Sequence, residues 1–141
     1  MAQLIEFATH HWELVLALVA VIALLLTGGN LFGGGVKQVG PVEATGLINH
    51  QDALVLDTRE ANEFSAGHII NALHIPAGRV DKDISRLEKF KDRQIIVACR
   101  SGSRSASACR QLKKLGFENV YNLQGGVMAW QSANLPLVRG K

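Results

Sequence analysis

The first 36 residues contain no lysine or arginine, although the chain of 141 residues has 15 of them. A cleaved signal peptide needs a basic segment before its apolar core, so this absence argues against one. Internal repeats and long low-complexity tracts are also absent, and the length and the 48% hydrophobic content allow one domain of ordinary size. The excess of apolar residues is concentrated near the N-terminus.

The sequence offers few candidate residues for a disulfide or a metal site. The only two cysteines, Cys99 and Cys109, lie ten positions apart, and we expect the first on a loop and the second on the apolar side of a helix, which argues against a disulfide. Cys109 is expected to contribute packing, with a role as a resolving cysteine as the alternative. His68 and His74 have apolar neighbours and no third candidate ligand nearby, so we expect them to brace loops and expect no metal.

One long uncharged segment lies near the N-terminus. Leu14 to Phe32 is 19 residues without a charged side chain, and a helix of that length spans roughly 28 Å, close to the thickness of the hydrocarbon core of a bilayer. The segment predicts a single transmembrane helix (14–32), preceded by a short tail (1–13) and followed by a glycine-rich linker (33–40). All 15 basic residues follow it, which favours the cytoplasmic side for the domain expected at 41–138.

The domain after the uncharged segment is basic. All 15 basic residues but only ten of the 12 acidic ones follow residue 36, so its net charge is about +5. Such a surface suits small anionic substrates or the anionic headgroups of lipids. It does not indicate a nucleic-acid partner, because neither an aromatic platform nor a recognition motif accompanies the charge.

Short apolar runs rich in β-branched residues alternate with segments of helical periodicity across the domain. Five such runs predict strands, at 36–39, 53–57, 73–76, 94–98 and 120–123. Helices are expected at 42–49, 61–67, 80–90, 103–115 and 127–131. This alternation predicts an α/β fold with a parallel five-stranded sheet and helices on both faces. Ligands of such folds bind beyond the carboxyl ends of the strands.

The segment CRSGSRS, from Cys99 to Ser105, follows the fourth predicted strand and precedes a helix. The backbone N–H groups of such a loop and the helix N-terminus bind anions together. Electropositive surroundings lower the pKa of a thiol, and the thiolate is the nucleophilic form. We therefore predict that Cys99 is a nucleophile, with a buried structural cysteine as the alternative. The residues expected to bind the anion are Arg100, Ser101, Gly102, Ser103 and Arg104.

Three segments resemble the motifs of one family. CRSGSRS resembles the active-site loop of rhodanese (sulfurtransferase) domains. The run from Asp57 to Pro76 is similar to the family's D-x-R-x-x-x-E-[FY]-x-x-G-H-I-x-x-A-x-x-[IL]-P motif, and LQGG at 123–126 with Trp130 is similar to its closing L-x-G-G-x-x-x-W. The resemblance covers about residues 37–138. The whole layout resembles the membrane-anchored, single-domain rhodaneses of the YibN type, which implies a single-pass protein of the bacterial inner membrane.

The resemblance implies sulfur transfer. The Cys99 thiolate would attack the outer sulfur of a thiosulfate-like anion, sulfite would leave beside Arg100 and Arg104, and a thiol or cyanide would then take the sulfur from the Cys99 persulfide. This covalent reaction needs no cofactor. The matching positions Asp57, Arg59 and His68 are expected to support the fold around the site rather than to take part in the reaction.

Two other functions stay open on the sequence alone. Cysteine phosphatases use a similar loop with one more residue between the cysteine and the arginine, whereas four residues separate Cys99 from Arg104, which favours sulfur over phosphate. The second is a membrane-tethered binding module that interacts with other membrane proteins through a helix or its basic face, with sulfur transfer incidental.

Overall fold

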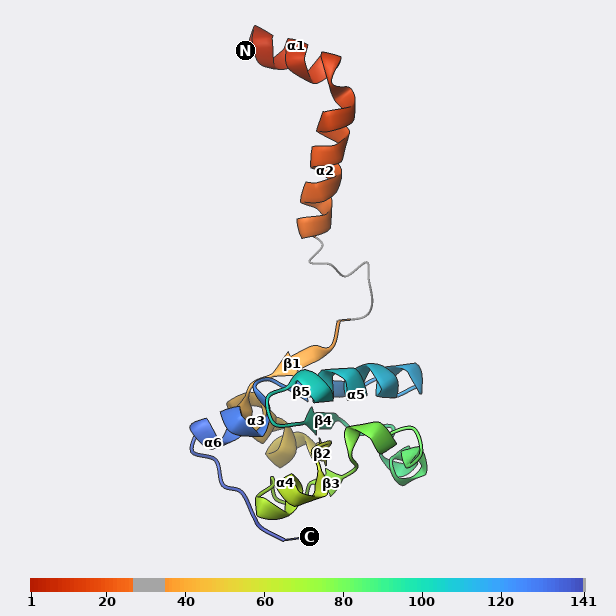
Figure 1. Ribbon diagram of the computed structural model, residues 1–141, viewed down its shortest axis with the longest axis vertical. Coiled ribbons are helices and arrows are strands. Elements are labelled where there is room, and N and C mark those ends of the chain that lie inside the picture. The colour runs from red at the N-terminus through yellow and green to blue at the C-terminus, as the bar shows by residue number, and fades with distance from the viewer. Residues whose placement is uncertain (27–34, 141) are drawn as a thin grey trace. The chain divides into compact units, whose positions relative to one another are not determined.

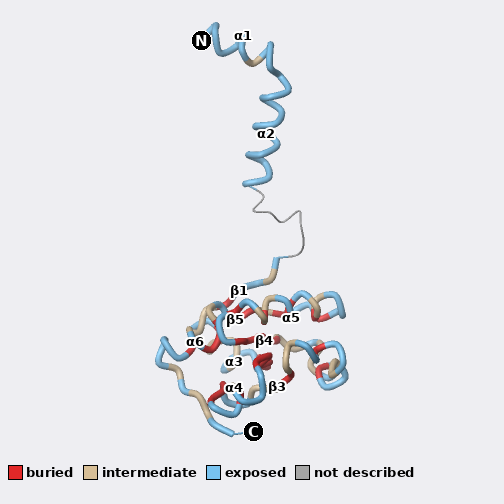
Figure 2. Tube along the Cα trace, viewed as in Figure 1, coloured by how far each residue is buried: buried red, intermediate tan, exposed pale blue. Residues whose placement is uncertain are grey.

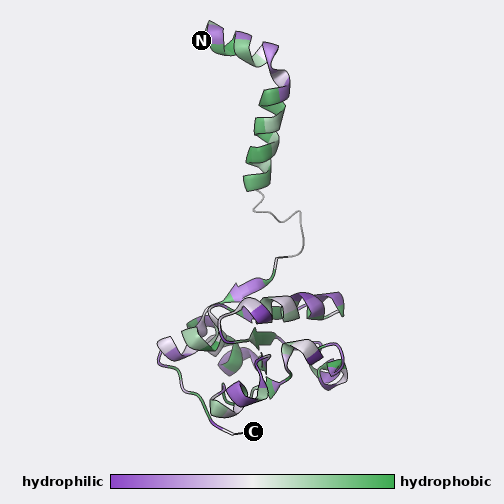
Figure 3. Cartoon of the chain, in the orientation of Figure 1, coloured by the Kyte–Doolittle hydropathy of each residue, from purple (hydrophilic) through white to green (hydrophobic). Residues whose placement is uncertain are grey.

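The computed structural model describes residues 1–26 and 35–140, which divide into two compact units on either side of the boundary between Gly35 and Val36. The first unit contains α1 (Ala2–His10) and α2 (Trp12–Leu26) (Figure 1). Every residue of α2 is exposed, and Figure 3 shows this helix as almost uniformly hydrophobic. Among the described residues, no single helix is long and apolar enough to cross a membrane, whereas α1 and α2 meet that criterion as a pair bent by 91°.

The N-terminal unit differs from the sequence prediction in one respect. Most of the tail predicted at 1–13 forms the helix α1, because its residues include good helix formers and neither glycine nor proline, and residues 12 and 13 begin α2. The helix ends at His11, whose backbone leaves the helical region and whose N–H donates to the carbonyl oxygen of Phe7 at 2.9 Å. Of the predicted span 14–32, the first part lies in α2, and residues 27–32 lie outside the described residues.

The second unit is a sheet of five parallel strands in the order β1-β5-β4-β2-β3 (Figure 1). The strands are β1 (Lys37–Val39), β2 (Leu54–Asp57), β3 (Leu73–His74), β4 (Ile95–Ala98) and β5 (Val120–Leu123). The helices are α3 (Pro41–Gln51), α4 (Ala61–Ala66), α5 (Ser103–Lys114) and α6 (Gly126–Ser132). The predicted α/β fold with a parallel five-stranded sheet is confirmed.

Helices cover both faces of the sheet because its central strands are buried on both sides. In β4, Ile95 and Val97 join one apolar cluster together with Leu112 of α5. The alternate residues of the strand point the other way, and Ile96 packs in a second cluster with Trp130 of α6. Figure 2 shows the buried residues gathered along these strands. The central strand β4 is therefore apolar along its whole length. Its carboxyl end lies in the middle of the row formed by the carboxyl ends of the five strands.

The helix predicted at 80–90 is wrong. In its place are the single 3₁₀ turns η3 (Ile84–Arg86) and η4 (Glu88–Phe90), and a third such turn, η2 (Ala77–Arg79), precedes them. The backbone N–H of Leu87 donates to Ile84, and that of Phe90 donates to Leu87, both at 2.9 Å. Ile84, Leu87 and Phe90 are three residues apart, and this interval aligns side chains on one face of a 3₁₀-helix. The apolar side chains still pack on the sheet, and Leu87 is fully buried.

The folded domain begins earlier than predicted. β1 pairs with β5, with Lys37 opposite Tyr121 and Val39 opposite Leu123, and Val39 is buried. The first strand therefore belongs to the sheet, although the predicted linker (33–40) includes it. Residues 33 and 34 of that linker lie outside the described residues.

Candidate active site

Cys99 directly follows β4, the central strand of the sheet, and its side chain is fully buried. The chain then turns within three residues into α5, which begins at Ser103. Gly102 makes this turn with φ of +103°, a left-handed conformation that favours glycine. The sequence pattern of strand, small-residue loop and helix start thus brings the N-terminal turn of α5 against the sulfur.

The sulfur of Cys99 accepts hydrogen bonds from this turn. The N–H of Gly102 donates to Sγ at 3.0 Å, and Oγ of Ser105 lies 3.4 Å from Sγ. Burial by itself raises the pKa of the Cys99 thiol, but hydrogen bonds from the Ser105 hydroxyl and from the backbone of Ser105, Gly102 and Ser101 outweigh it, so the pKa lies below its ordinary value. A lower pKa means a larger thiolate fraction at neutral pH, which suits a nucleophile.

Hydrogen bonds therefore take the role that the sequence suggested for the arginine charges. Arg104 lies with its Nη2 3.5 Å from Oε1 of Glu63 in α4, and the two side chains are 41% and 28% exposed. Such an exposed pair contributes at most about 1 kcal/mol. A substrate anion can therefore compete with Glu63 for this guanidinium. Arg100, Ser101 and Ser103 occupy exposed positions of the same loop.

The start of α6 holds the loop from the other side. The N–H of Val127 donates to the carbonyl oxygen of Cys99 at 2.8 Å, and the N–H of Met128 donates to that of Arg100 at 3.1 Å. Gly126 has φ of +61°, and a Cβ atom there would overlap both of these carbonyl oxygens. Gly126, the second glycine of the closing motif, is thus needed because the backbone of α6 approaches the loop too closely for any side chain, whereas a side chain at Gly125 would meet Ala129 within α6.

Asp57 and Arg59 form a buried ion pair one strand away from the loop. Nη2 of Arg59 lies 2.8 Å from Oδ2 of Asp57 and also donates to the carbonyl oxygen of Gly67 at 2.7 Å. Between them, the backbone N–H and the hydroxyl of Thr58 both donate to the carbonyl oxygen of Ala98, at 2.9 and 3.0 Å. Ala98 immediately precedes Cys99. The segment after β2 therefore braces the end of β4.

The two histidines contact backbone carbonyl groups and aromatic rings. Nδ1 of His68 lies 2.8 Å from the carbonyl oxygen of Phe64, and its ring stacks on the Phe64 ring with centroids 3.8 Å apart. The backbone of His68 exchanges two hydrogen bonds with Val138, both of 2.8 Å. Nε2 of His74 lies 2.7 Å from the carbonyl oxygen of Arg59. The ring of His68 thus contacts α4, and the ring of His74 contacts the segment that follows β2.

Cys109 lies on the buried face of α5 and is a free thiol, as is Cys99. Burial raises its pKa to about 12, an effect that the nearby Lys113 and Arg110 only partly oppose. The thiol therefore stays protonated at neutral pH and has the environment of a packing residue.

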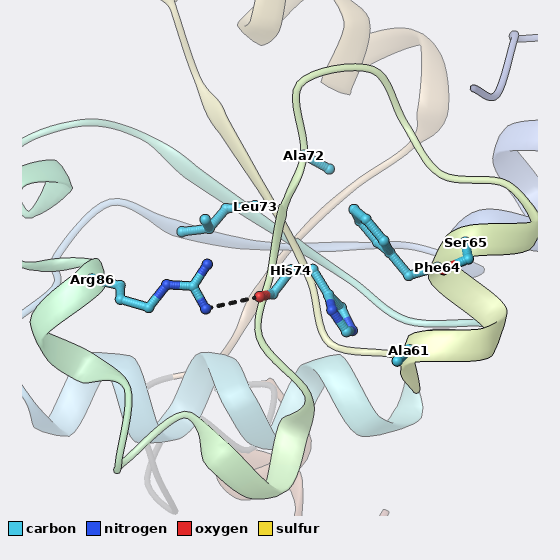
Figure 4. Close-up of a pocket in the computed structure, with 7 residues that line it drawn as sticks. All are labelled: Ala61, Phe64, Ser65, Ala72, Leu73, His74 and Arg86. Carbon is cyan, nitrogen blue, oxygen red and sulfur yellow. Dashed lines mark hydrogen bonds between the residues drawn. The ribbon is translucent and has the colours of Figure 1, made fainter. Parts of the chain in front are cut away.

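A cavity of about 480 Å³ lies between α4 and β3 (Figure 4). Figure 4 shows the rings of Phe64 and His74 face to face, with centroids 4.5 Å apart, and Nη1 of Arg86 donates to the carbonyl oxygen of His74 at 3.2 Å. None of the residues that line the cavity belongs to the loop after β4. It is thus distinct from the space around the sulfur.

Two residues near the sulfur were not predicted. Ser105 is fully buried, and Asn122 in β5 is 3% exposed. The signal was present in both cases, because a serine stands on the buried face of α5 and an asparagine interrupts an otherwise apolar strand. Their contact could not be predicted, since it depends on β5 lying beside β4.

The fold and the loop together define a class of protein. It is a parallel α/β domain with a low-pKa cysteine in a hydrogen-bonding loop at the carboxyl end of the central strand. The model of the rhodanese-like domain matches residues 41–133, and the chain belongs to this family.

Known relatives agree with this assignment. The uncharacterized protein YibN of Escherichia coli strain K12 is 37% identical over 143 residues, which cover all of both chains. A sulfurtransferase of Allochromatium vinosum is 38% identical over 92 residues, which cover 65% of this chain and 84% of the relative. The crystal structure of a rhodanese-related protein from Thermoplasma volcanium superposes with a TM-score of 0.67 at 30% identity, covering 74% of this chain and 99% of that one.

Proposed function

We propose that the chain transfers sulfane sulfur from a thiosulfate-like anion to a thiophilic acceptor through a persulfide on Cys99. The observation that supports this most directly is the hydrogen bond of 3.0 Å from the Gly102 N–H to Sγ, in a loop that lowers the pKa of the thiol. A buried structural cysteine has the opposite property, as the raised pKa of Cys109 illustrates.

The reaction has two steps, and each conserves the electron count. In the first, the Cys99 thiolate attacks the outer sulfur of thiosulfate, a new S–S bond forms, the old S–S bond breaks, and sulfite leaves with its electron pair. Arg104 and the exposed Arg100 supply the positive charge that receives the donor and the leaving anion. In the second, an acceptor thiolate or cyanide attacks the outer sulfur of the persulfide, and Cys99 leaves as a thiolate.

The intact mass of the purified full-length chain tests this proposal. We expect a gain of about 32 Da after incubation with thiosulfate, since one sulfur atom is added. Subsequent addition of cyanide or a small thiol should return the mass to its starting value, because the second step removes that atom.

Protein alkylated at Cys99 before the incubation provides the control and should gain nothing. If unblocked protein also gains nothing while Cys99 still reacts with the alkylating reagent, the thiol is present but does not accept sulfur. That result would contradict sulfur transfer and favour the membrane-tethered binding module.

We also propose that α2, with the uncharged residues that follow it, anchors the chain in the bacterial inner membrane with the domain in the cytoplasm. The uniform exposure of its apolar side chains supports an apolar surrounding, and every basic residue follows it. We expect the full chain to sediment with membranes and to resist alkaline extraction, and a variant without residues 1–35 to stay in solution. Digestion of the domain by protease added to intact spheroplasts would contradict the cytoplasmic placement.

A further inference from the structure

Asn122 lies at the centre of a buried group of polar atoms beside the sulfur. It stands in β5 directly opposite Gln38 of β1, and its Nδ2 donates to Oε1 of Gln38 at 3.1 Å and to the carbonyl oxygen of Gly102 at 3.0 Å. Its Oδ1 accepts a hydrogen bond from the hydroxyl of Ser105. The amide therefore contacts the two residues, Gly102 and Ser105, whose hydrogen bonds reach Sγ of Cys99.

The orientation of the Asn122 amide follows from its partners. The carbonyl oxygen of Gly102 is only an acceptor, so the amide nitrogen must face it. The amide oxygen then faces Ser105 and accepts from its hydroxyl. Both N–H groups and the oxygen of Asn122 have partners, which is what a nearly fully buried amide requires.

The Ser105 hydroxyl has a choice of acceptors. Besides the Asn122 oxygen, the carbonyl oxygen of Gly102 lies 3.1 Å and Sγ of Cys99 lies 3.4 Å from its Oγ. The Gly102 oxygen already accepts from Asn122 at 3.0 Å and from the N–H of Ala106 at 3.2 Å, so both of its lone pairs are in use and it competes weakly for the hydroxyl proton. Asn122 therefore keeps the Ser105 oxygen within reach of the sulfur, where the hydroxyl proton is shared between the Asn122 oxygen and the thiolate in a three-centre hydrogen bond.

We propose that Asn122 is a positioning residue, whose amide holds Gly102 and the Ser105 hydroxyl in place against the sulfur of Cys99. Gly102 needs such support, since its left-handed backbone conformation is one of several open to glycine. The inference rests on the proposed function of Cys99 as the nucleophile and assigns to Asn122 a role that acts through its two neighbours.

Titration of the thiolate tests this role without any sulfur donor. The ultraviolet absorbance of the thiolate is followed against pH in the full-length chain, with the Cys99→Ala variant as the baseline. We expect Asn122→Val, which suits a strand, to raise the pKa of Cys99 and to slow persulfide formation at neutral pH by at least about fivefold, because Gly102 and Ser105 are then held less firmly against the thiolate. Asn49→Ala, at an exposed position of α3, should change neither.

Ser105→Ala should also raise the pKa of Cys99, and the double variant should raise it by less than the sum of the two single effects, since Asn122 acts in part through Ser105. If Asn122→Val does not fold, Asn122→Asp keeps the shape and the acceptor but loses the N–H to Gly102 and adds a negative charge, and it too should raise the pKa.

Three outcomes would overturn the role of Asn122. They are a pKa of Cys99 that is unchanged or lower in these variants, a loss of thermal stability with unchanged thiolate titration, and strictly additive effects of Asn122 and Ser105. The proposed function can fail separately. If the titration shifts as expected but thiosulfate adds no mass to the wild-type chain, Asn122 positions a thiolate that does not transfer sulfur.

Discussion

Cys99→Ala is expected to abolish sulfur transfer while leaving the fold intact. The thiol is the only group at the end of β4 that can form the covalent intermediate of the proposed reaction, and removing the nucleophile of a covalent enzyme costs up to about 10⁶-fold in rate. We expect a loss of at least about 10³-fold in the transfer of sulfur from thiosulfate to cyanide. The measurement is the initial rate of thiocyanate formation, with circular dichroism and thermal unfolding to confirm the fold.

Cys109→Ala is the matched control for this experiment. Both cysteines are buried and free, but the raised pKa of Cys109 keeps its thiol protonated. We expect this variant to lose about 1 kcal/mol of stability through the small cavity it leaves in the core. Its rate per folded molecule should equal that of the wild type. Turnover that survives in Cys99→Ala but falls in Cys109→Ala would show that Cys109 is the nucleophile and would contradict the proposed mechanism.

The central sheet was predictable because its determinants are local. Ile95 to Ala98 is a short, continuous run of apolar and β-branched residues, which is typical of a strand buried on both faces. The loop after it was predictable for the same reason, since the cysteine, the small residues and the helix start are adjacent in sequence. Placing Cys99 at the carboxyl end of a parallel strand needed no tertiary information.

The errors have a different origin. The apolar spacing between Val80 and Phe90 combines intervals of three and four, which an α-helix and successive 3₁₀ turns can both satisfy, so the pattern did not distinguish them. The strand predicted at 36–39 is present as β1, but the predicted domain boundary at residue 41 left it in the linker, because it lies beside a glycine-rich stretch. Its pairing with β5 makes it a strand, and this pairing depends on residues more than 80 positions away.

The cause of the lowered thiol pKa could not be predicted for the same reason. The sequence shows the charges of Arg100 and Arg104 next to Cys99, but it does not show that Ser105 turns toward the sulfur or that Asn122 lies behind it. The sequence shows which residues carry a charge, wherever they lie relative to the sulfur. A hydrogen bond depends on the distance and angle between two groups, which are known only once the order of the strands is known. The hydrogen bonds that lower the pKa of Cys99 therefore became apparent only from the folded structure.

Among alanine substitutions of the described glycines, we expect Gly126→Ala to disturb the active-site loop most. The substitution places a side chain at φ of +61° and makes its Cβ overlap the carbonyl oxygens of Cys99 and Arg100. Left-handed backbone costs a residue other than glycine roughly 1–2 kcal/mol, and the overlap adds to this, so we expect the free energy of unfolding to fall by about 2–4 kcal/mol. Denaturant titration measures this loss.

The same overlap should affect catalysis, because the two carbonyl groups belong to the loop that holds the sulfur. Relief requires either α6 or the loop to move, and a displacement of about 1 Å at a reacting group can cost about 10²-fold in rate. Gly46→Ala is the matched control, since Gly46 lies inside α3 with nothing within 4 Å of an added Cβ atom. It should gain about 0.5–1 kcal/mol of stability and keep the wild-type rate. If Gly126→Ala behaves like Gly46→Ala in both measurements, the contact between α6 and the loop does not determine the position of Cys99, and the glycine at position 126 must have another cause.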